Sequence, residues 1–189
     1  MLFWNANPIL VQLGPIAVHW YGALFAAGFL LGYQLMQRIY RQEGRPTEQL
    51  DKLLTYIFIG TVVGARLAHT LIYEPEYYLA HPIDILKIWE GGLASHGGGI
   101  GVLLAIWLFV RQHPENRFLW LADRLAIPTA LTGCFIRLGN FMNSEIIGNP
   151  TDGSWGVVFE RIDNLPRHPV QLYEAACYFI TFVFLFLLF

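Results

Sequence analysis

Five long stretches of this chain contain almost no charged residues. In the first, residues 16–36, only His19 and Gln34 are strongly polar. Each stretch approaches the ~20 residues that an α-helix needs to cross a hydrocarbon core of ~30 Å. A soluble domain of 189 residues, 55% hydrophobic and 14% charged, would leave too much apolar surface in water. We therefore predict an all-α fold, a polytopic membrane helix bundle with about five transmembrane helices at about 16–36, 53–73, 93–110, 119–136 and 170–189.

The segments between these spans fit a single membrane domain covering residues 1–189. Leu79–Trp89 is shorter and more broken than a span, which indicates a lateral or re-entrant piece. The polar segment at about 140–168 is rich in Pro and Gly, so we expect an exterior loop with short extended pieces around Trp155–Phe159. Glycines four residues apart also share one helix face, and for the first two of these pairs we favour close helix packing. The pairs are Gly28/Gly32, Gly60/Gly64 and Gly97/Gly101.

Basic residues are concentrated in two of the connections between the predicted spans. The positive-inside rule places these connections, the first and the third, in the cytoplasm. The N-terminus and the polar segment at 140–168 then lie outside. The net charge of −2 gives no electrostatic reason to expect a nucleic-acid partner. The basic residues are Arg38, Arg41, Arg45, Lys52, Arg111, Arg117 and Arg124.

A polar cluster lies where the fourth predicted span ends. Its members are Arg137, Gly139, Asn140, Asn143, Glu145 and Gly148. Because such groups are costly to remove from water, their concentration at a membrane boundary indicates a function. A guanidinium held by amides and a carboxylate is suited to grip a phosphodiester through paired hydrogen bonds. The alternative for Arg137 is snorkelling to lipid headgroups, which requires none of these neighbours.

Three other segments bring polar residues to the same predicted exterior face. They begin the first, third and fifth spans and supply Tyr21, His96, Gly97, Gly98, His168 and Glu174. The glycines beside His96 would leave its ring and the nearby backbone N–H groups open to a ligand.

Arg66 lies near the middle of the second predicted span, where a charge must face protein or water. Pairing with a carboxylate and contacting a second phosphate are both open for it. The two cysteines fall in separate spans and form neither a disulfide framework nor a metal site. We expect no metal and no cofactor.

These motifs resemble those of the bacterial prolipoprotein diacylglyceryl transferase family. The family signature G-R-x-G-N-F-x-N-x-E-x-x-G is similar to residues 136–148, with Ile136 in place of the first glycine. That departure concerns local helix packing more than chemistry. Residues 19–22 resemble the family's first-helix motif, residues 96–98 its His-Gly-Gly motif and residues 167–174 its post-loop motif.

The resemblance implies a reaction between two membrane-held substrates. The diacylglyceryl group of phosphatidylglycerol moves to the lipobox cysteine thiol of a preprolipoprotein, forming a thioether and releasing glycerol phosphate. It also implies the bacterial cytoplasmic (inner) membrane, with the active face on the exterior or periplasmic side.

The resemblance further implies roles for individual residues. His96 would be the general base for the thiol, Arg137 would stabilise the departing phosphate, and Tyr21 would be the functional tyrosine. Asn140 and Glu145 would orient Arg137 or the lipid glycerol. The other expected substrate-binding residues are Asn143, Gly148, Gly97, Gly98, His168, Glu174 and Arg66.

Members of this family continue through further spans that supply a second important arginine. This chain ends at Phe189 in an apolar run with no basic or polar anchor. We expect that the later spans are missing and that the 189-residue form has little or no activity.

Two other functions fit parts of the sequence. A membrane lipid hydrolase is suggested by the glycines after His96, which resemble an oxyanion loop, but no serine lies in a G-x-S-x-G motif. A small transporter or channel could use Arg137 as an anion site, although transporters more often carry paired repeats and broken helices at the midplane.

The predicted orientation has a direct test. A topology reporter fused near Gly44 should read cytoplasmic, and one fused near Asp163 should read exterior, because the basic connections stay inside. The reverse pattern would overturn this topology.

Overall fold

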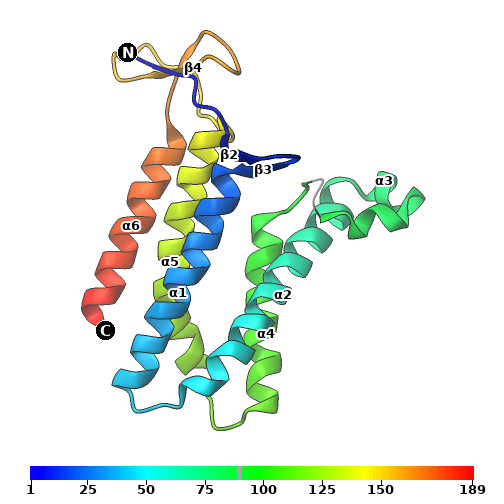
Figure 1. The fold of residues 1–189 in the computed structure, drawn as a ribbon, viewed down its shortest axis with the longest axis vertical. Helices are drawn as coiled ribbons and strands as arrows, with labels where there is room; N and C mark the ends of the chain where they lie inside the picture. The colour runs from blue at the N-terminus through cyan, green and yellow to red at the C-terminus, as the bar shows by residue number, and fades with distance from the viewer. Residues whose placement is uncertain (89–90) are drawn as a thin grey trace. The chain divides into compact units, whose positions relative to one another are not determined.

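The computed structural model describes residues 1–88 and 91–189, so Trp89, at the end of the predicted lateral segment, lies outside the described residues. The chain is mostly helical and divides into two compact units (Figure 1). Unit 1 contains Met1–Met36 and Leu125–Phe189, and unit 2 contains Gln37–Arg124. Helices α1 (Trp20–Gln42) and α5 (Phe118–Asn143) each contribute to both units.

Unit 1 is built on α1, α5 and α6 (Val170–Leu188). Gly28 of α1 faces α5 so closely that a Cβ there would lie 3.0 Å from Cγ2 of Thr132. Likewise, a Cβ at Gly133 of α5 would lie 2.9 Å from the Tyr178 ring of α6. Small residues therefore let both neighbours approach α5. The packing role predicted for Gly28 and Gly32 is confirmed.

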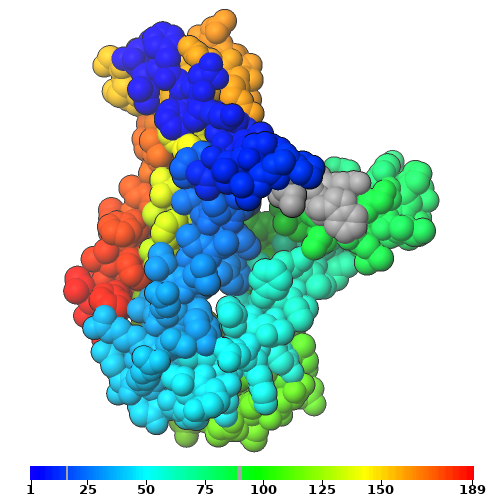
Figure 2. Space-filling view, in the orientation of Figure 1, coloured from blue at the N-terminus to red at the C-terminus, as the bar shows by residue number. Residues whose placement is uncertain are grey.

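A three-stranded sheet covers one end of unit 1. Its strands are β1 (Leu2–Trp4), β4 (Val157–Phe159) and β5 (Pro166–Arg167), with β1 parallel and β5 antiparallel to β4. Figure 2 shows the N-terminal residues and the loop after α5 packed together at this end. Phe141, Val157 and Phe159 form its buried apolar centre, against which Trp4 packs. The Trp4 indole also donates to the Phe141 carbonyl at 3.1 Å, which ties the sheet to the end of α5.

Strands β2 (Ile9–Leu13) and β3 (Ile16–His19) form an antiparallel hairpin before α1. The prediction of a helical span from residue 16 is therefore wrong by four residues. Residues 16–19 are apolar enough to resemble a helix start, but β3 pairs its backbone with β2 across a turn at Gly14, where φ is +60°. The chain is mostly helical, as predicted, with two small sheets added to the helices, and β4 lies in the extended piece predicted around Trp155–Phe159.

Unit 2 contains two long antiparallel helices and several short helical pieces. In chain order they are the 3₁₀ turn η1 (Thr47–Gln49), α2 (Leu50–Ala68), the π-helical segment η2 (His69–Tyr73), α3 (Pro75–Ala80), the 3₁₀ segment η3 (Pro82–Leu86) and α4 (Ser95–Gln112). The two elements of the predicted lateral segment, α3 and η3, are each too short to cross a bilayer.

Helices α2 and α4 pack through glycines on both. A methyl group added at Gly101 would overlap the carbonyl oxygen of Gly60, and one at Gly97 would overlap Gly64 and Ala68. Backbones this close leave room for no side chain. The packing role predicted for Gly60 and Gly64 is confirmed.

By length and apolar composition, three helical stretches among the described residues could cross a membrane. They are Thr47–Tyr73, Phe118–Asn143 and Val170–Leu188. Helices also occupy the other two predicted positions, as α1 and α4. Helix α5 continues past the predicted span and the predicted start of the loop at residue 140, so Asn140 and Asn143 are helical. Bonds from the Ser144 and Glu145 N–H groups to the carbonyls of Phe141 and Asn140 close its last turn.

The glycine contact between α2 and α4 gives a stability prediction. Gly101→Ala should lower the melting temperature in detergent by several degrees, because overpacking costs about 1–3 kcal/mol. Gly99→Ala on the same helix is the matched control, since a Cβ there meets nothing within 4 Å. Equal melting temperatures for the two variants would contradict this packing.

Candidate functional site

The end of α5 and the starts of α1 and α6 lie together in unit 1 (Figure 1). Most of the site residues singled out in the sequence lie in these helix ends and in the loop between α5 and α6. They are Tyr21, Arg137, Gly139, Asn140, Asn143, Glu145, Gly148, His168 and Glu174.

Arg137 is held from two sides. Its Nε lies 2.6 Å from Oε2 of Glu174, a residue of α6. Its Nη1 donates to Oδ1 of Asn140 at 3.3 Å. The remaining Nη1 and Nη2 hydrogens have no hydrogen-bond partner among residues 1–88 and 91–189. The side chain is 21% exposed, so part of it remains accessible to a ligand. It has the planar geometry that binds two oxygens of one phosphate.

Asn140 and Glu145 extend this contact into a chain of hydrogen bonds. The Asn140 amide, only 5% exposed, donates to Oε2 of Glu145 at 3.3 Å. Asn143 donates to the other oxygen, Oε1, at 3.2 Å. One carboxylate thereby fixes two amides, and one of these amides orients Arg137.

The turn that carries Glu145 has an unusual backbone. Ser144 and Ile146, on either side of it, have φ values of 57° and 52°, a left-handed conformation that is costly for residues other than glycine. Gln171 of α6 donates its amide to the Glu145 carbonyl at 2.6 Å. Gly148 lets the start of α6 approach, because a Cβ there would lie 2.5 Å from the His168 carbonyl oxygen.

Tyr21 packs beside this cluster. A Cβ at Gly139 would lie 2.9 Å from the Tyr21 ring and 3.1 Å from its Cα. Gly139 therefore brings α1 against the segment of α5 that carries Arg137 and Asn140.

The segment before α6 is also ordered by ionic contacts. Arg167 pairs with Asp163 through its Nε and Nη2 and donates to the Gly148 carbonyl at 3.2 Å. The hydrogen bond from Arg167 lowers the pKa of Asp163 below its ordinary value. The His168 ring packs against that of Trp155 in a tilted arrangement, with centroids 4.7 Å apart, and its Nδ1 lies 3.4 Å from the Tyr173 hydroxyl. The structure thus gives His168 an aromatic setting at the edge of the cluster.

The other predicted site residues belong to unit 2. His96 is exposed at the start of α4, with its ring 5.7 Å from that of Tyr73. Gly97 is buried against α2, and the Gly98 N–H donates to the Ala94 carbonyl at 3.1 Å. Gly97 therefore serves helix packing, and Gly98 belongs to the first turn of α4. The sequence had instead suggested that the backbone N–H groups here are open to a ligand.

Arg66 takes neither of the two roles considered for it. The residue is 4% exposed, and its guanidinium donates to backbone carbonyls of η3 and of the loop before α4. The acceptors are Asp84 at 2.6 Å, Ile85 at 2.9 Å, Gly91 at 2.5 Å and Gly92 at 3.2 Å. With four of its five donors used in this way, Arg66 fastens the lateral segment to α2 and is not positioned as an open phosphate contact.

Sequence reasoning gave no role to His69 or Gln171. The π-helical segment places His69 3.6 Å from Glu74 and stacks its ring on Tyr73, which in turn contacts His96. Periodicity gives no signal for a π-helix, although such segments often occur at functional sites. In the sequence, Gln171 was noted only as part of the motif at residues 167–174.

Similar proteins point to one family. A family model described as prolipoprotein diacylglyceryl transferase matches residues 8–189. A protein of Tolumonas auensis is 94% identical over 189 residues, which cover all of this chain and 73% of that protein. Proteins of Chloroherpeton thalassium and Porphyromonas gingivalis are 51% and 44% identical, covering 98% and 95% of this chain and 69% and 67% of their own lengths. All three are named phosphatidylglycerol–prolipoprotein diacylglyceryl transferase.

The ion pair at Arg137 predicts how the cluster responds to an anion. Glu174→Gln should tighten the binding of glycerol phosphate about two- to five-fold, since it removes a competing carboxylate from a partly exposed pair. Isothermal calorimetry measures this directly. Glu160→Gln, in the exposed loop of the same unit, is the control and should change nothing. Weaker binding by the Glu174 variant would mean that this carboxylate orients Arg137 and does not compete for it.

Proposed function

The chain belongs to the prolipoprotein diacylglyceryl transferase family, and we propose that the cluster around Arg137 is where it binds the phosphodiester of phosphatidylglycerol. The protein is a transferase of lipoprotein biosynthesis. It moves the diacylglyceryl group of phosphatidylglycerol to a prolipoprotein, the first step in the maturation of bacterial lipoproteins. The observation that carries the proposal is a partly exposed Arg137 side chain whose remaining Nη hydrogens have no hydrogen-bond partner among the described residues.

The reaction determines what the site must supply. The thiolate sulfur of the lipobox cysteine attacks the glyceryl carbon that is bonded to a phosphate oxygen. The new S–C bond is the thioether, and the C–O bond breaks with its electron pair on the oxygen of the departing glycerol phosphate. The phosphate group thereby passes from one negative charge toward two. A cation beside it binds the transition state more strongly than the bound lipid, which is the requirement for catalysis.

Arg137 meets this requirement only in part. Glu174 pairs with its Nε, and Glu145 adds a second carboxylate nearby through Asn140. Two carboxylates against one guanidinium leave no excess positive charge for the phosphate. The site would therefore gain from a second cation, as the family resemblance implies.

The thiol must also lose its proton, since the free thiol has a pKa near 8.5. His96, exposed at the start of α4, is the proposed general base. Tyr21, packed on Gly139, is the proposed functional tyrosine. Asn140, Asn143 and Glu145 would hold Arg137 in place.

The proposed setting is the bacterial inner membrane. All five long helices would cross it as one multi-pass domain, with the N-terminus and the Arg137 cluster on the exterior side. The basic connections would face the cytoplasm. Both phosphatidylglycerol and the lipobox peptide would then reach the site from the membrane. The lipid hydrolase and the transporter considered from the sequence gain no support from the relatives.

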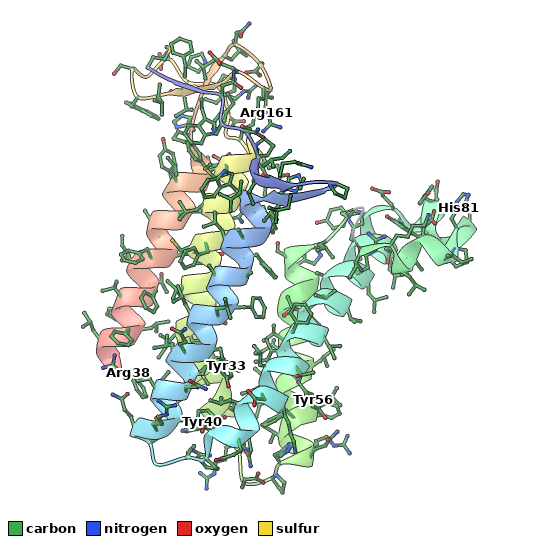
Figure 3. All side chains as sticks on the ribbon, in the orientation of Figure 1. Tyr33, Arg38, Tyr40, Tyr56, His81 and Arg161 are labelled. Atoms are coloured by element: carbon green, nitrogen blue, oxygen red, sulfur yellow. The ribbon has the colours of Figure 1, made fainter. Side chains whose placement is uncertain are left out.

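The assignment of Arg137 is tested by transfer of a labelled diacylglyceryl group to a lipobox peptide in mixed micelles. Arg137→Ala should lose at least about 100-fold in kcat/KM, the cost of removing an electrostatic contact made in the transition state. Arg161→Ala, an exposed arginine in the loop of the same unit (Figure 3), should retain the wild-type rate. The assay is run on this chain and on the longer Tolumonas auensis relative with the equivalent substitutions. A wild-type rate for Arg137→Ala would refute the phosphate-binding role.

His96 is tested in the same assay. His96→Gln should lower the rate most near neutral pH and less at pH 9, where the thiol ionises without a base. A loss that is equal at all pH values would exclude proton transfer by His96.

A further inference from the structure

The turn around Glu145 is poorly explained by stability alone. Ser144 and Ile146 both have positive φ, and Ile146 is β-branched, for which this conformation is an outlier. Among the described residues, the buried atoms Asn143 Oδ1, Ser144 Oγ and Gln171 Oε1 have no hydrogen-bond partner. Native structures seldom leave so many buried polar atoms unpaired in one place. A strained turn with unpaired polar atoms is typical of a segment retained for function.

One side chain from another helix holds this turn. Gln171 is 1% exposed, and its Nε2 donates to the Glu145 carbonyl at 2.6 Å. It lies in the first turn of α6, close after His168 and Val170, whose backbone carbonyl and side chain respectively lie against Gly148. A fully buried amide with a single bond to a main-chain carbonyl fixes where that carbonyl lies.

The position of Gln171 affects that of Arg137 through two chains of contacts. Through the main chain, Gln171 sets Glu145, whose carboxylate binds the amides of Asn140 and Asn143. Through α6, Gln171 is one turn before Glu174, which pairs with Nε of Arg137. Gln171 itself has no contact with Arg137 among the hydrogen bonds of the described residues.

We propose that Gln171 is a positioning residue for the transfer reaction, which locks the Ser144–Ile146 turn so that Glu145 and Asn140 hold Arg137 in line with the departing phosphate. The inference rests on the proposed function of Arg137. Gln171 is buried and uncharged, so neither exposure nor charge would mark it as a residue that positions Arg137.

The first test is Gln171→Met, which keeps the length and removes the donor. We expect kcat to fall about 10- to 100-fold with KM for phosphatidylglycerol changed less than about threefold, because a misplaced cation is felt mainly in the transition state. The melting temperature should change little, since the variant loses one hydrogen bond and also removes an unpaired buried oxygen. Gln12→Met is the matched control, because Gln12 makes the same kind of bond, to the Gly14 carbonyl at 2.7 Å, on an exposed hairpin.

A double-mutant cycle tests the route through Glu145. If Gln171 acts through that residue, Gln171→Met combined with Glu145→Gln should be no slower than the slower single variant. Multiplied losses would place Gln171 outside this chain of contacts and overturn the proposal.

Gln171→Glu decides the matter even if the methionine variant folds poorly. A buried glutamic acid has a raised pKa, and in its protonated form it donates a hydrogen bond to the Glu145 carbonyl, whereas the ionised form repels it. Relative to wild type, this variant should therefore regain activity as pH falls from 8 to 6. A flat ratio with wild type would refute the donor role. These assays use the longer Tolumonas auensis relative with the equivalent substitutions, because little or no activity is expected of the 189-residue form. If wild type and Gln12→Met of that protein form no thioether, the proposed function fails; if they do and Gln171→Met matches them, only this inference fails.

Discussion

The ion pair between Arg137 and Glu174 joins the end of α5 to the start of α6, and the packing at this end of unit 1 brings these two elements together. A guanidinium at the end of a membrane helix has to be compensated by a nearby group, and here the compensation comes from a different helix at 2.6 Å. That requires α6 to begin beside the end of α5. Gly148 and the Gln171 amide bring it there, and the sheet formed by β1, β4 and β5 covers the loop between the two helices.

Apolar length predicted where the five long helices lie, and three helical stretches among the described residues are long and apolar enough to cross a bilayer. An extended piece was predicted where β4 lies, but not the pairing of strands into sheets. The pairing of Leu2 with Val157 joins residues at opposite ends of the chain, and nothing local in either three-residue strand announces it. The helix start predicted at residue 16 was wrong because an apolar hairpin strand and the start of an apolar helix have the same composition.

The site was predictable where charge alone identified it. Arg137, Asn140 and Glu145 of the predicted polar cluster are joined by hydrogen bonds, and Glu174, from another segment predicted at the same face, forms an ion pair with Arg137. The role of Arg66 was not predictable, because a buried arginine can donate hydrogen bonds to carbonyls as well as to anions. Only the folded structure shows that its acceptors are carbonyls. Gln171 carried no signal of its own, since a neutral amide at the start of a helix is common. Its role depends on a strained turn that the sequence does not reveal.

The central claim is that Arg137 binds the phosphodiester of phosphatidylglycerol. Phosphorus NMR of mixed micelles measures this without turnover, by following the phosphatidylglycerol resonance as protein is added. The account predicts that wild-type protein shifts and broadens this resonance and that Arg137→Gln, folded to the same extent by circular dichroism, leaves it unchanged. A resonance that Arg137→Gln shifts as strongly as wild type does would contradict the claim.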